Sequence, residues 1–475
     1  MTKVDTRMRG YDKKVQQVNL MQRTLVINVV GLTRNLIGEH TPNLQKLLGN
    51  SVDIKPMVPA VTCAVQATYL TGKTPAEHGI VANGWYFRDL NEVWLWRQSN
   101  RLIQAPKIWD MARAKDSSFT CANTFWWYAM ATGADYTLTP RPLYCADGSK
   151  LPDCYTYPLE WREELSQALG PFPLFQFWGP ATSIKSSAWI ADAAINVELK
   201  KSPSLQLVYL PHLDYCLQKV GPQGDISKDL QEVDGLVGKL LDFFTARNCR
   251  VIVLSEYGIG AVDTPVHPNR ILREANLLAV KTDLGREYLE TATSKAFAVA
   301  DHQIAHVYIQ DAELIPTVKQ LFEQQPGIAR VLDAEGKREL GLDHERSGEL
   351  ILLAEANAWF TYYYWLDDNK APDFAPTVEI HRKPGYDPCE LFFNPTLRFP
   401  MLRMAGKVLR KKLGFRYLMD VISMQPEQVK GSHGLALPGA DSTPIFMSTE
   451  AHLVPSEPIA ATDVCDLLLR HVFDE

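Results

Sequence analysis

The sequence lacks any long apolar run, and no stretch approaches the roughly 20 consecutive residues that a membrane-spanning helix needs. The N-terminal segment 1–20 is polar and basic and has no apolar region of the kind found in secretory signals. We therefore expect no transmembrane segment and a cytoplasmic location. We also expect residues 1–20 to be a disordered tail, with either Met1 or Met21 as the true start.

Closely spaced cysteines and a marked excess of positive charge are also missing. The eight cysteines form no CxxC pair, so we interpret most of them as small buried side chains in a reducing compartment. Cys145 and Cys154 flank a loop, but their spacing alone does not favour a disulfide. The net charge of −6, with no prominent basic face, excludes a nucleic acid polymer as the expected partner.

The chain contains instead an alternation of short β-branched runs with helical periodicity. With 475 residues, of which 46% are hydrophobic, it has ample material for a large core. Continuous apolar runs of four to eight residues are typical of strands buried on both faces of a parallel sheet. The pattern predicts a doubly wound, mostly parallel α/β sheet sandwiched by helices. The expected strands are 24–31, 205–210, 250–254 and 306–309, and the expected helices are 42–48, 107–114, 186–199 and 230–244.

Residues 21–475 are predicted to form a single α/β domain with inserted loops or cap regions. Segments 131–180 and 366–430 are rich in proline and tyrosine and show little periodicity, so we interpret both as insertions at the sheet edge. Several aromatic clusters invite two interpretations, a wall for bases or lipids or simple packing of an insertion on the core, and packing is favoured. These clusters are Trp94, Trp96, Trp126, Trp127 and the run 362–365.

Segment 59–83, PAVTCAVQATYLTGKTPAEHGIVAN, carries the clearest functional signal. It places Thr62 on a turn between an extended run and a helical run that a Thr-Gly pair closes. The free N–H groups and positive dipole end of a helix N-terminus bind anions. A hydroxyl at that point can attack a phosphoryl or sulfuryl centre.

This segment resembles the nucleophile region of the alkaline phosphatase superfamily, in particular its type I phosphodiesterase/nucleotide pyrophosphatase branch. In that branch a Thr precedes a helix that is followed by TG and P-x-x-H-G-I-x-x-N. The resemblance implies an alkaline-phosphatase-like fold, Thr62 as nucleophile and Asn83 as a ligand for the transferred group. Cys63 invites a sulfatase interpretation, but the C-x-P-S-R context is absent.

The resemblance also implies two metal ions, which would activate the nucleophile and neutralise the phosphoryl oxygens. The second site is altered in three of its ligands. Val30 stands where the first strand should end in aspartate, and Glu256 and Tyr257 replace an Asp-His pair. Valine offers no lone pair, so we expect this site to be empty. Glu256 keeps its charge and fits either a further metal ligand or a general base.

The first site is better preserved. Asp214 matches its aspartate and His433 its histidine, whereas Gln218 replaces a second histidine and is a candidate for a weak third ligand. His212 is a possible substitute, because in an extended chain it would share a face with Asp214. A hydrogen-bonded structural histidine is the other interpretation of His212, and it is slightly preferred. The expected cofactor is one divalent ion, most simply zinc, or no ion at all.

Asp301, His302 and His306 lie close together in a run that reads as a strand, and we interpret them as pocket lining or structure. The leading functional hypothesis is a phosphate-ester hydrolase acting on a small phosphorylated metabolite. The alternative is a catalytically inactive relative that binds a phosphorylated or aromatic metabolite. A transferase or lyase with the same fold is a third hypothesis.

Overall fold

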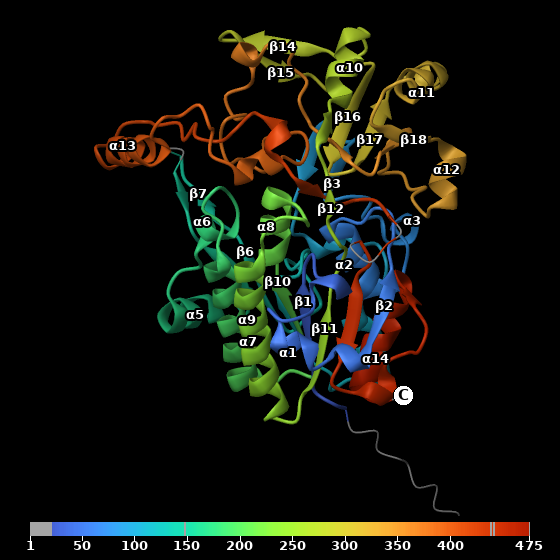
Figure 1. Cartoon of the computed structure of the whole chain (residues 1–475), viewed down its shortest axis with the longest axis vertical. Helices are drawn as coiled ribbons and strands as arrows, with labels where there is room; N and C mark the ends of the chain where they lie inside the picture. Colours follow the sequence, from blue (N-terminus) through green and yellow to red (C-terminus); the bar gives the residue numbers. More distant parts are fainter. Residues whose placement is uncertain (1–20, 147–148, 438, 440–441, 475) are drawn as a thin grey trace, which may run out of the picture.

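The computed structural model describes residues 21–146, 149–437, 439 and 442–474. Its largest element is a nine-stranded sheet at the centre of the lower part of the molecule (Figure 1). Five adjacent strands run parallel to one another, in the order β11, β1, β10, β5 and β6. Strand β22 pairs antiparallel with β11 at one side of this group, and β9 pairs antiparallel with β6 at the other. The order is β23 (Ile459–Ala460), β2 (Ser51–Lys55), β22 (Ile445–Ser448), β11 (Arg250–Leu254), β1 (Thr24–Val29), β10 (Leu205–Leu210), β5 (Cys121–Thr124), β6 (Tyr136–Pro140) and β9 (Cys154–Tyr157).

Helices cover this sheet and bury its strands, which confirms the predicted doubly wound α/β class. Strands β1 and β10 are buried at every residue, as expected for strands between two helical layers. Helices α7 and α9 pack on each other and on β10 and β11 respectively, while α14 packs on α2 and α4. These helices are α7 (Ile184–Lys201), α9 (Ser227–Thr245), α14 (Val464–Phe473), α2 (Thr62–Thr71) and α4 (Ile108–Lys115). Helix α1 (Pro42–Gln45) packs on α9, and α5 (Trp161–Leu169) packs on α7 and β9.

A second sheet of four antiparallel strands forms the upper part of the molecule (Figure 1). It has its own hydrophobic cluster, separate from the cluster around the large sheet. The predicted strand 306–309 belongs here and not to the parallel sheet, because a short apolar run does not specify its partners. The strands are β16 (Ala296–Asp301), β17 (Ile304–Ile309), β19 (Leu350–Ala354) and β18 (Ile328–Leu332), with helices α10 (Pro268–Glu274), α11 (Ile315–Glu323) and α12 (Ala334–Glu339) beside them.

Helix α2 joins the two hydrophobic clusters. All ten of its residues are buried, as expected for a helix covered on every side. Val65, Tyr69 and Leu70 pack in the cluster of the large sheet, whereas Ala64 and Ala67 pack in the cluster of the upper sheet. The N-terminus of α2 therefore has a fixed position between the two sheets.

The two segments predicted as insertions differ in their structure. Segment 131–180 contributes β6 and β9 to the edge of the large sheet, together with α5 and α6 (Leu174–Phe177). Segment 366–430 is mostly irregular and contains α13 (Pro400–Lys412), which lies at the margin of the molecule (Figure 1). The division into one domain with two insertions stays a prediction, and the predicted tail 1–20 lies outside the described residues.

In the described part of the chain, every helix is too short or too polar to cross a lipid bilayer. The cytoplasmic location stays a prediction. Cys145 and Cys154 are both free thiols, in agreement with their interpretation from spacing. Trp126 and the aromatic run 362–365 are buried, so packing is the correct interpretation for these rings.

Candidate active site

Thr62 is the first residue of α2. The preceding residue, Val61, is extended (φ −129°, ψ 147°), and Gly72 ends the helix in the left-handed conformation (φ +67°). A left-handed residue at this point favours glycine, which explains the Thr-Gly pair in the sequence. The predicted turn, helix and helix end are thus confirmed, and the Thr62 hydroxyl lies beside the N-terminus of a buried helix.

A chain of hydrogen bonds connects the Thr62 hydroxyl to a carboxylate. Thr62 Oγ1 lies 2.8 Å from the hydroxyl of Tyr257, which donates to Asp214 Oδ1 over 3.5 Å. Either hydroxyl can be the donor in the bond between Thr62 and Tyr257, and Thr62 donates when the Tyr257 proton is directed to Asp214. Burial raises the pKa of Asp214 to about 7 and the pKa of Tyr257 well above its usual value. Tyr257 therefore stays protonated, and Asp214 gains or loses its proton near neutral pH.

Asn83 is held against the start of the same helix. Its Oδ1 accepts a hydrogen bond from the backbone N–H of Cys63 at 2.9 Å. Its backbone N–H and its amide both donate to the buried carboxylate of Asp301, at 2.7 and 3.0 Å. Asn83 is thus fixed beside Thr62 with one amide hydrogen left for a further acceptor.

Glu256 lies just beyond the end of β11, and two amides fix its carboxylate. Asn28 and Gln66 donate to Oε1 at 2.5 and 2.6 Å, and Oε2 has no hydrogen-bond partner. Burial raises the pKa of Glu256 to about 8, and the nearby Thr62 hydroxyl lowers it slightly. At neutral pH the protonated form of Glu256 therefore prevails.

Replacing Glu256 by glutamine is expected to stabilise the protein, and increasingly so as the pH rises. The folded state holds a proton up to about pH 8, whereas the unfolded chain loses it near the ordinary value of 4.5. The contribution of Glu256 to the free energy of unfolding is fully present below about pH 4.5 and is lost as the pH rises through about 8. Glutamine keeps the acceptor for Asn28 and Gln66 without titrating. Thermal unfolding should show a gain of about 3 °C or more near pH 8.5 and little near pH 5.

The matched control is Glu39→Gln, since the Glu39 side chain is 85% exposed. It should shift the melting temperature by the same small amount at every pH. If Glu256→Gln raised the melting temperature by the same amount at every pH, the pKa of Glu256 would not be raised in the folded protein.

Asp214 and His433 face each other across the site. His433 Nδ1 donates to the carbonyl of Ala60 at 2.7 Å, and burial lowers the pKa of His433 to about 3. The ring is therefore neutral, and Nε2 carries a lone pair without a hydrogen-bond partner, 3.5 Å from Asp214 Oδ1. Gly431 makes this approach possible, because a Cβ there would lie 2.3 Å from the carbonyl oxygen of Leu217.

Gln218 presents its amide hydrogens to the site. Its Nε2 donates to Asp214 Oδ2 at 2.8 Å, and its Oε1 accepts from the Tyr386 hydroxyl at 2.8 Å. In this arrangement Gln218 orients Asp214, and its oxygen faces Tyr386.

Four stacked rings form one wall of the site. Neighbouring ring centroids lie 3.8 Å apart for Tyr257 and His433, 3.6 Å for His433 and His302, and 3.8 Å for His302 and Tyr386. His302 occupies the turn between β16 and β17 at a positive φ of 59°. It therefore lines the site, as the sequence suggested, whereas His306 bonds the carbonyl of Val81 within the upper sheet.

The two-metal arrangement that the resemblance implies does not fit these residues. Val30 is fully buried and offers no lone pair, and the Glu256 carboxylate is bonded by amides. The Tyr257 hydroxyl bonds both Thr62 and Asp214, the groups that a second ion would approach. Among the described residues, Asp214 and His433 belong to no group of three acidic, histidine or cysteine side chains within 4.8 Å of one another. One ion, held by Asp214 and the unpaired Nε2 of His433, does fit.

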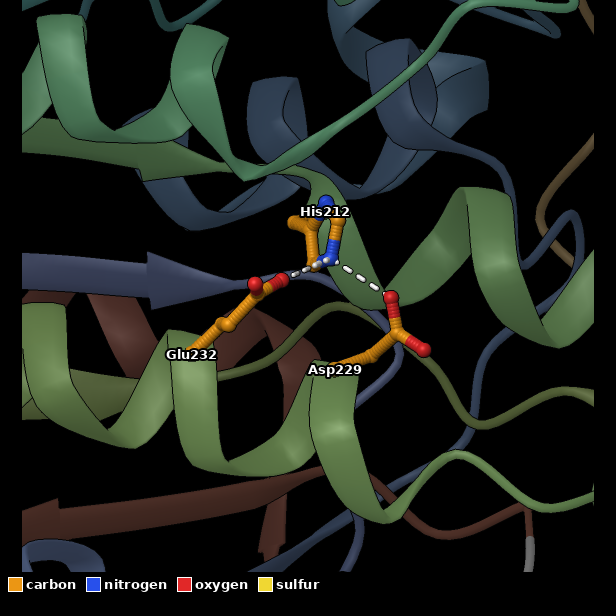
Figure 2. A group of neighbouring side chains, drawn as sticks. All are labelled: His212, Asp229 and Glu232. Carbon is orange, nitrogen blue, oxygen red and sulfur yellow. Dashed lines mark hydrogen bonds and ion pairs between the residues drawn. The ribbon is translucent and has the colours of Figure 1, made fainter.

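His212 lies apart from Asp214, and the extended conformation assumed for this pair is wrong. Residues 212–220 form helix α8 (His212–Val220), in which side chains two positions apart point in different directions. Nε2 of His212 lies 2.8 Å from Asp229 Oδ1 and 3.7 Å from Glu232 Oε2 on α9 (Figure 2). His212 thus forms an ion-pair group that joins α8 to α9, and it lowers the pKa of Asp229.

The sequence missed several residues of the site. Asn28, Gln66 and Tyr386 all contact the predicted residues directly. Asn28 could have been recognised from the sequence, because a polar residue inside a buried apolar strand needs a hydrogen-bond partner. Tyr386 lies in an irregular segment, where sequence patterns carry no information on contacts.

The protein has a mostly parallel sheet, a threonine at a helix N-terminus, and acidic and histidine side chains close to that threonine. These features define an alkaline-phosphatase-like protein. The murine ectonucleotide pyrophosphatase/phosphodiesterase 5 has a similar structure, with a TM-score of 0.57, 15% identity and 95% of each chain covered. Phosphonoacetate hydrolase of Sinorhizobium meliloti, solved with phosphonoformate, has a TM-score of 0.58 at 14% identity, with 95% of this chain and 96% of that chain covered.

Residues 24–387 match the family described as type I phosphodiesterase / nucleotide pyrophosphatase. The chain belongs to this family. An uncharacterized pyrophosphatase/phosphodiesterase of Schizosaccharomyces pombe is 25% identical over 269 residues, 54% of this chain and 47% of that protein. Ectonucleotide pyrophosphatase/phosphodiesterase 1 of Saccharomyces cerevisiae is 24% identical over 302 residues, 57% of this chain and 37% of that protein. The chain thus spans less than half the length of these curated relatives.

Proposed function

We propose that this protein hydrolyses the phosphate ester of a small metabolite, with Thr62 as the nucleophile. The observation that carries the proposal is the convergence of five residues from four distant segments on one place. Thr62, Asn83, Asp214, Glu256 and His433 lie in one network of contacts at the N-terminus of α2. An inactive variant of the structurally similar murine protein was solved in complex with AMP, which supports a nucleotide or a related ester as the substrate class.

The network provides a path for the nucleophile's proton. As Thr62 Oγ1 forms a bond to phosphorus and the bond to the leaving oxygen breaks, the Thr62 proton passes to Tyr257 and the Tyr257 proton passes to Asp214. A carboxylate with a pKa of about 7 is a suitable acceptor at neutral pH. The leaving group departs with the bonding electrons of its P–O bond and takes a proton from water. Water then cleaves the Thr62 phosphoester, and the proton held by Asp214 returns through Tyr257 to restore the Thr62 hydroxyl. Asn83 holds the transferred group through its remaining amide hydrogen.

Glu256 is proposed as the second proton acceptor of the site. With a pKa of about 8 it serves as a base only in the upper part of the physiological pH range. At lower pH Asp214 serves as the proton acceptor. Its bonds to Asn28 and Gln66 argue against Glu256 as a metal ligand.

Asp214 and His433 are proposed to hold one divalent ion, with zinc favoured by the imidazole and carboxylate donors. When bound, the ion supplies positive charge for the phosphoryl oxygens. Two protein ligands leave positions for water and substrate, and they also make binding weak compared with a three-ligand site.

Metal analysis of the purified protein is expected to find about one zinc or fewer per chain. His433→Ala should lower the zinc content at least about tenfold, because it removes the only nitrogen donor that faces Asp214. Hydrolysis of a bis-nitrophenyl phosphate should fall in parallel. His212→Ala is the matched control, since this histidine is also buried but bonds Asp229 outside the site. Protein that retains no metal and turns over no ester would contradict the proposal.

Binding without turnover is a second candidate function, and one observation favours it specifically. Thr62 is only 4% exposed and its hydroxyl is engaged by Tyr257, while Val30 removes a metal ligand. A phosphate ester that raises the melting temperature and is never consumed would support this function. Consumption of the same ester would support the hydrolase.

A further inference from the structure

Helix α13 (Pro400–Lys412) and its flanks combine exposed apolar side chains with a concentration of positive charge. None of the thirteen residues of the helix is buried. Between Glu390 and Asp420 the chain contains no acidic residue. The same stretch contains seven basic residues, which are Arg398, Arg403, Lys407, Arg410, Lys411, Lys412 and Arg416. This local excess is opposite in sign to the net charge of −6 of the whole chain.

The orientation of α13 is the reverse of that expected for a helix of a globular protein. Such helices turn their apolar side to the core and their charged side to water. In α13, Arg403 and Lys407 instead pair with Asp420 of the following segment. Leu402, Leu409 and Leu413, on the far side of the helix, are exposed by 69, 58 and 64%. The apolar side thus faces outward.

Further side chains extend this apolar face. Met401 and Val408 extend the exposed apolar surface around one flank of the leucines, and Phe399 and Phe415 flank the helix ends. Arg410, Lys412 and Arg416 lie near the face and form no ion pair within the described residues. We call the residues 399–416 the α13 surface. Apolar areas of this kind on a protein surface mark interaction sites.

We propose that the α13 surface binds an anionic lipid membrane, with the helix lying in the plane of the headgroups. A basic amphipathic helix with leucine and phenylalanine on its apolar side has the composition of interfacial helices. Thirteen residues span about 20 Å, which suffices to lie in the interface but not to cross the bilayer. Long basic side chains beside the apolar face reach the phosphate groups while the leucines enter the acyl region.

Charge complementarity selects this occupant over others. An anionic bilayer offers both an apolar layer and a continuous negative surface, whereas a second copy of this chain would bring a second set of seven cations to the same face. The exposed apolar and basic side chains of the α13 surface are observed independently of any reaction at Thr62.

The test is co-sedimentation of the full chain with two kinds of vesicle, one of phosphatidylcholine and one of equal parts phosphatidylcholine and phosphatidylglycerol. We expect binding to the anionic vesicles, at least about tenfold weaker binding to the neutral ones, and weakening by high salt. Leu402→Glu with Leu409→Glu should reduce binding at least about tenfold. Arg410→Glu with Lys412→Glu should remove the preference for anionic vesicles. All these side chains are exposed, so circular dichroism and melting temperature should be unchanged.

Leu199→Glu is the matched control, because Leu199 is 60% exposed on helix α7, away from the α13 surface. It should leave vesicle binding unchanged. The proposal is overturned if the unmodified chain binds neither kind of vesicle or if the control weakens binding as much as the α13 variants. It is also overturned if sedimentation shows a dimer that Leu402→Glu with Leu409→Glu dissociates, since a second copy would then cover this face.

Discussion

Replacing Thr62 by alanine is expected to reduce phosphate-ester hydrolysis by about 10³-fold or more, because the proposed nucleophile is removed. The side chain is small and its hydroxyl makes one hydrogen bond, to Tyr257, so the fold should remain intact. The measurement is kcat on a nitrophenyl phosphodiester, with the melting temperature recorded for each variant. Thr62→Ser should retain activity within about tenfold, since it keeps the hydroxyl.

Cys63→Ala is a second control for this experiment. Cys63 follows Thr62 on the helix and is fully buried, and burial raises the pKa of its thiol well above the usual value. A thiol of this kind is a poor nucleophile, so the variant should remain active. Undiminished turnover by Thr62→Ala would assign the attack to another group. Absence of turnover in the unmodified protein, together with ligand-induced stabilisation, would favour binding without catalysis.

The large sheet could be predicted closely from the sequence. The bounds of β10 (Leu205–Leu210) and β11 (Arg250–Leu254) match the predicted runs at both ends, and β1 ends two residues before the predicted Gly31. Strands buried on both faces are continuous apolar runs bounded by turn residues, so the sequence indicates where each strand begins and ends. The start and end of α2 were equally clear, because the local turn chemistry of Thr62 and Gly72 determines them.

The upper sheet and much of the site could not be predicted, because contacts distant in sequence determine them. The metal-ligand alternative for His212 failed because residues after β10 form a helix where an extended chain was assumed, whereas the preferred interpretation of His212 as a hydrogen-bonded structural residue is confirmed. Tyr386 reaches the site only through the fold around the upper sheet, where its ring stacks on His302. The α13 surface could not be predicted either, because only the structure shows that the apolar side of this helix faces outward.

Tyr257 is the residue whose role most separates this site from the two-metal arrangement of its family. Its hydroxyl bonds the nucleophile on one side and Asp214 on the other. We expect Tyr257→Phe to lower kcat about 10²-fold with little change in KM, because the path for the Thr62 proton is cut while the substrate's contacts are kept. Phenylalanine preserves the ring stacked on His433, so the wall of the site should not collapse.

The pH dependence of kcat distinguishes a proton path from a purely structural hydroxyl. In the metal-free protein kcat should rise with pH through about 7, since only the ionised form of Asp214 accepts a proton. An ion bound to Asp214 would lower the pKa of this carboxyl and move the rise to lower pH. Asp214→Asn should abolish that rise. Tyr386→Phe is the matched control, because it removes a tyrosine hydroxyl of the same wall that bonds Gln218 and does not touch Thr62. It should change kcat less than about threefold. Faster turnover by Tyr257→Phe would mean that the hydroxyl restrains Thr62, and that this tyrosine keeps the nucleophile inactive where its relatives would bind a second ion.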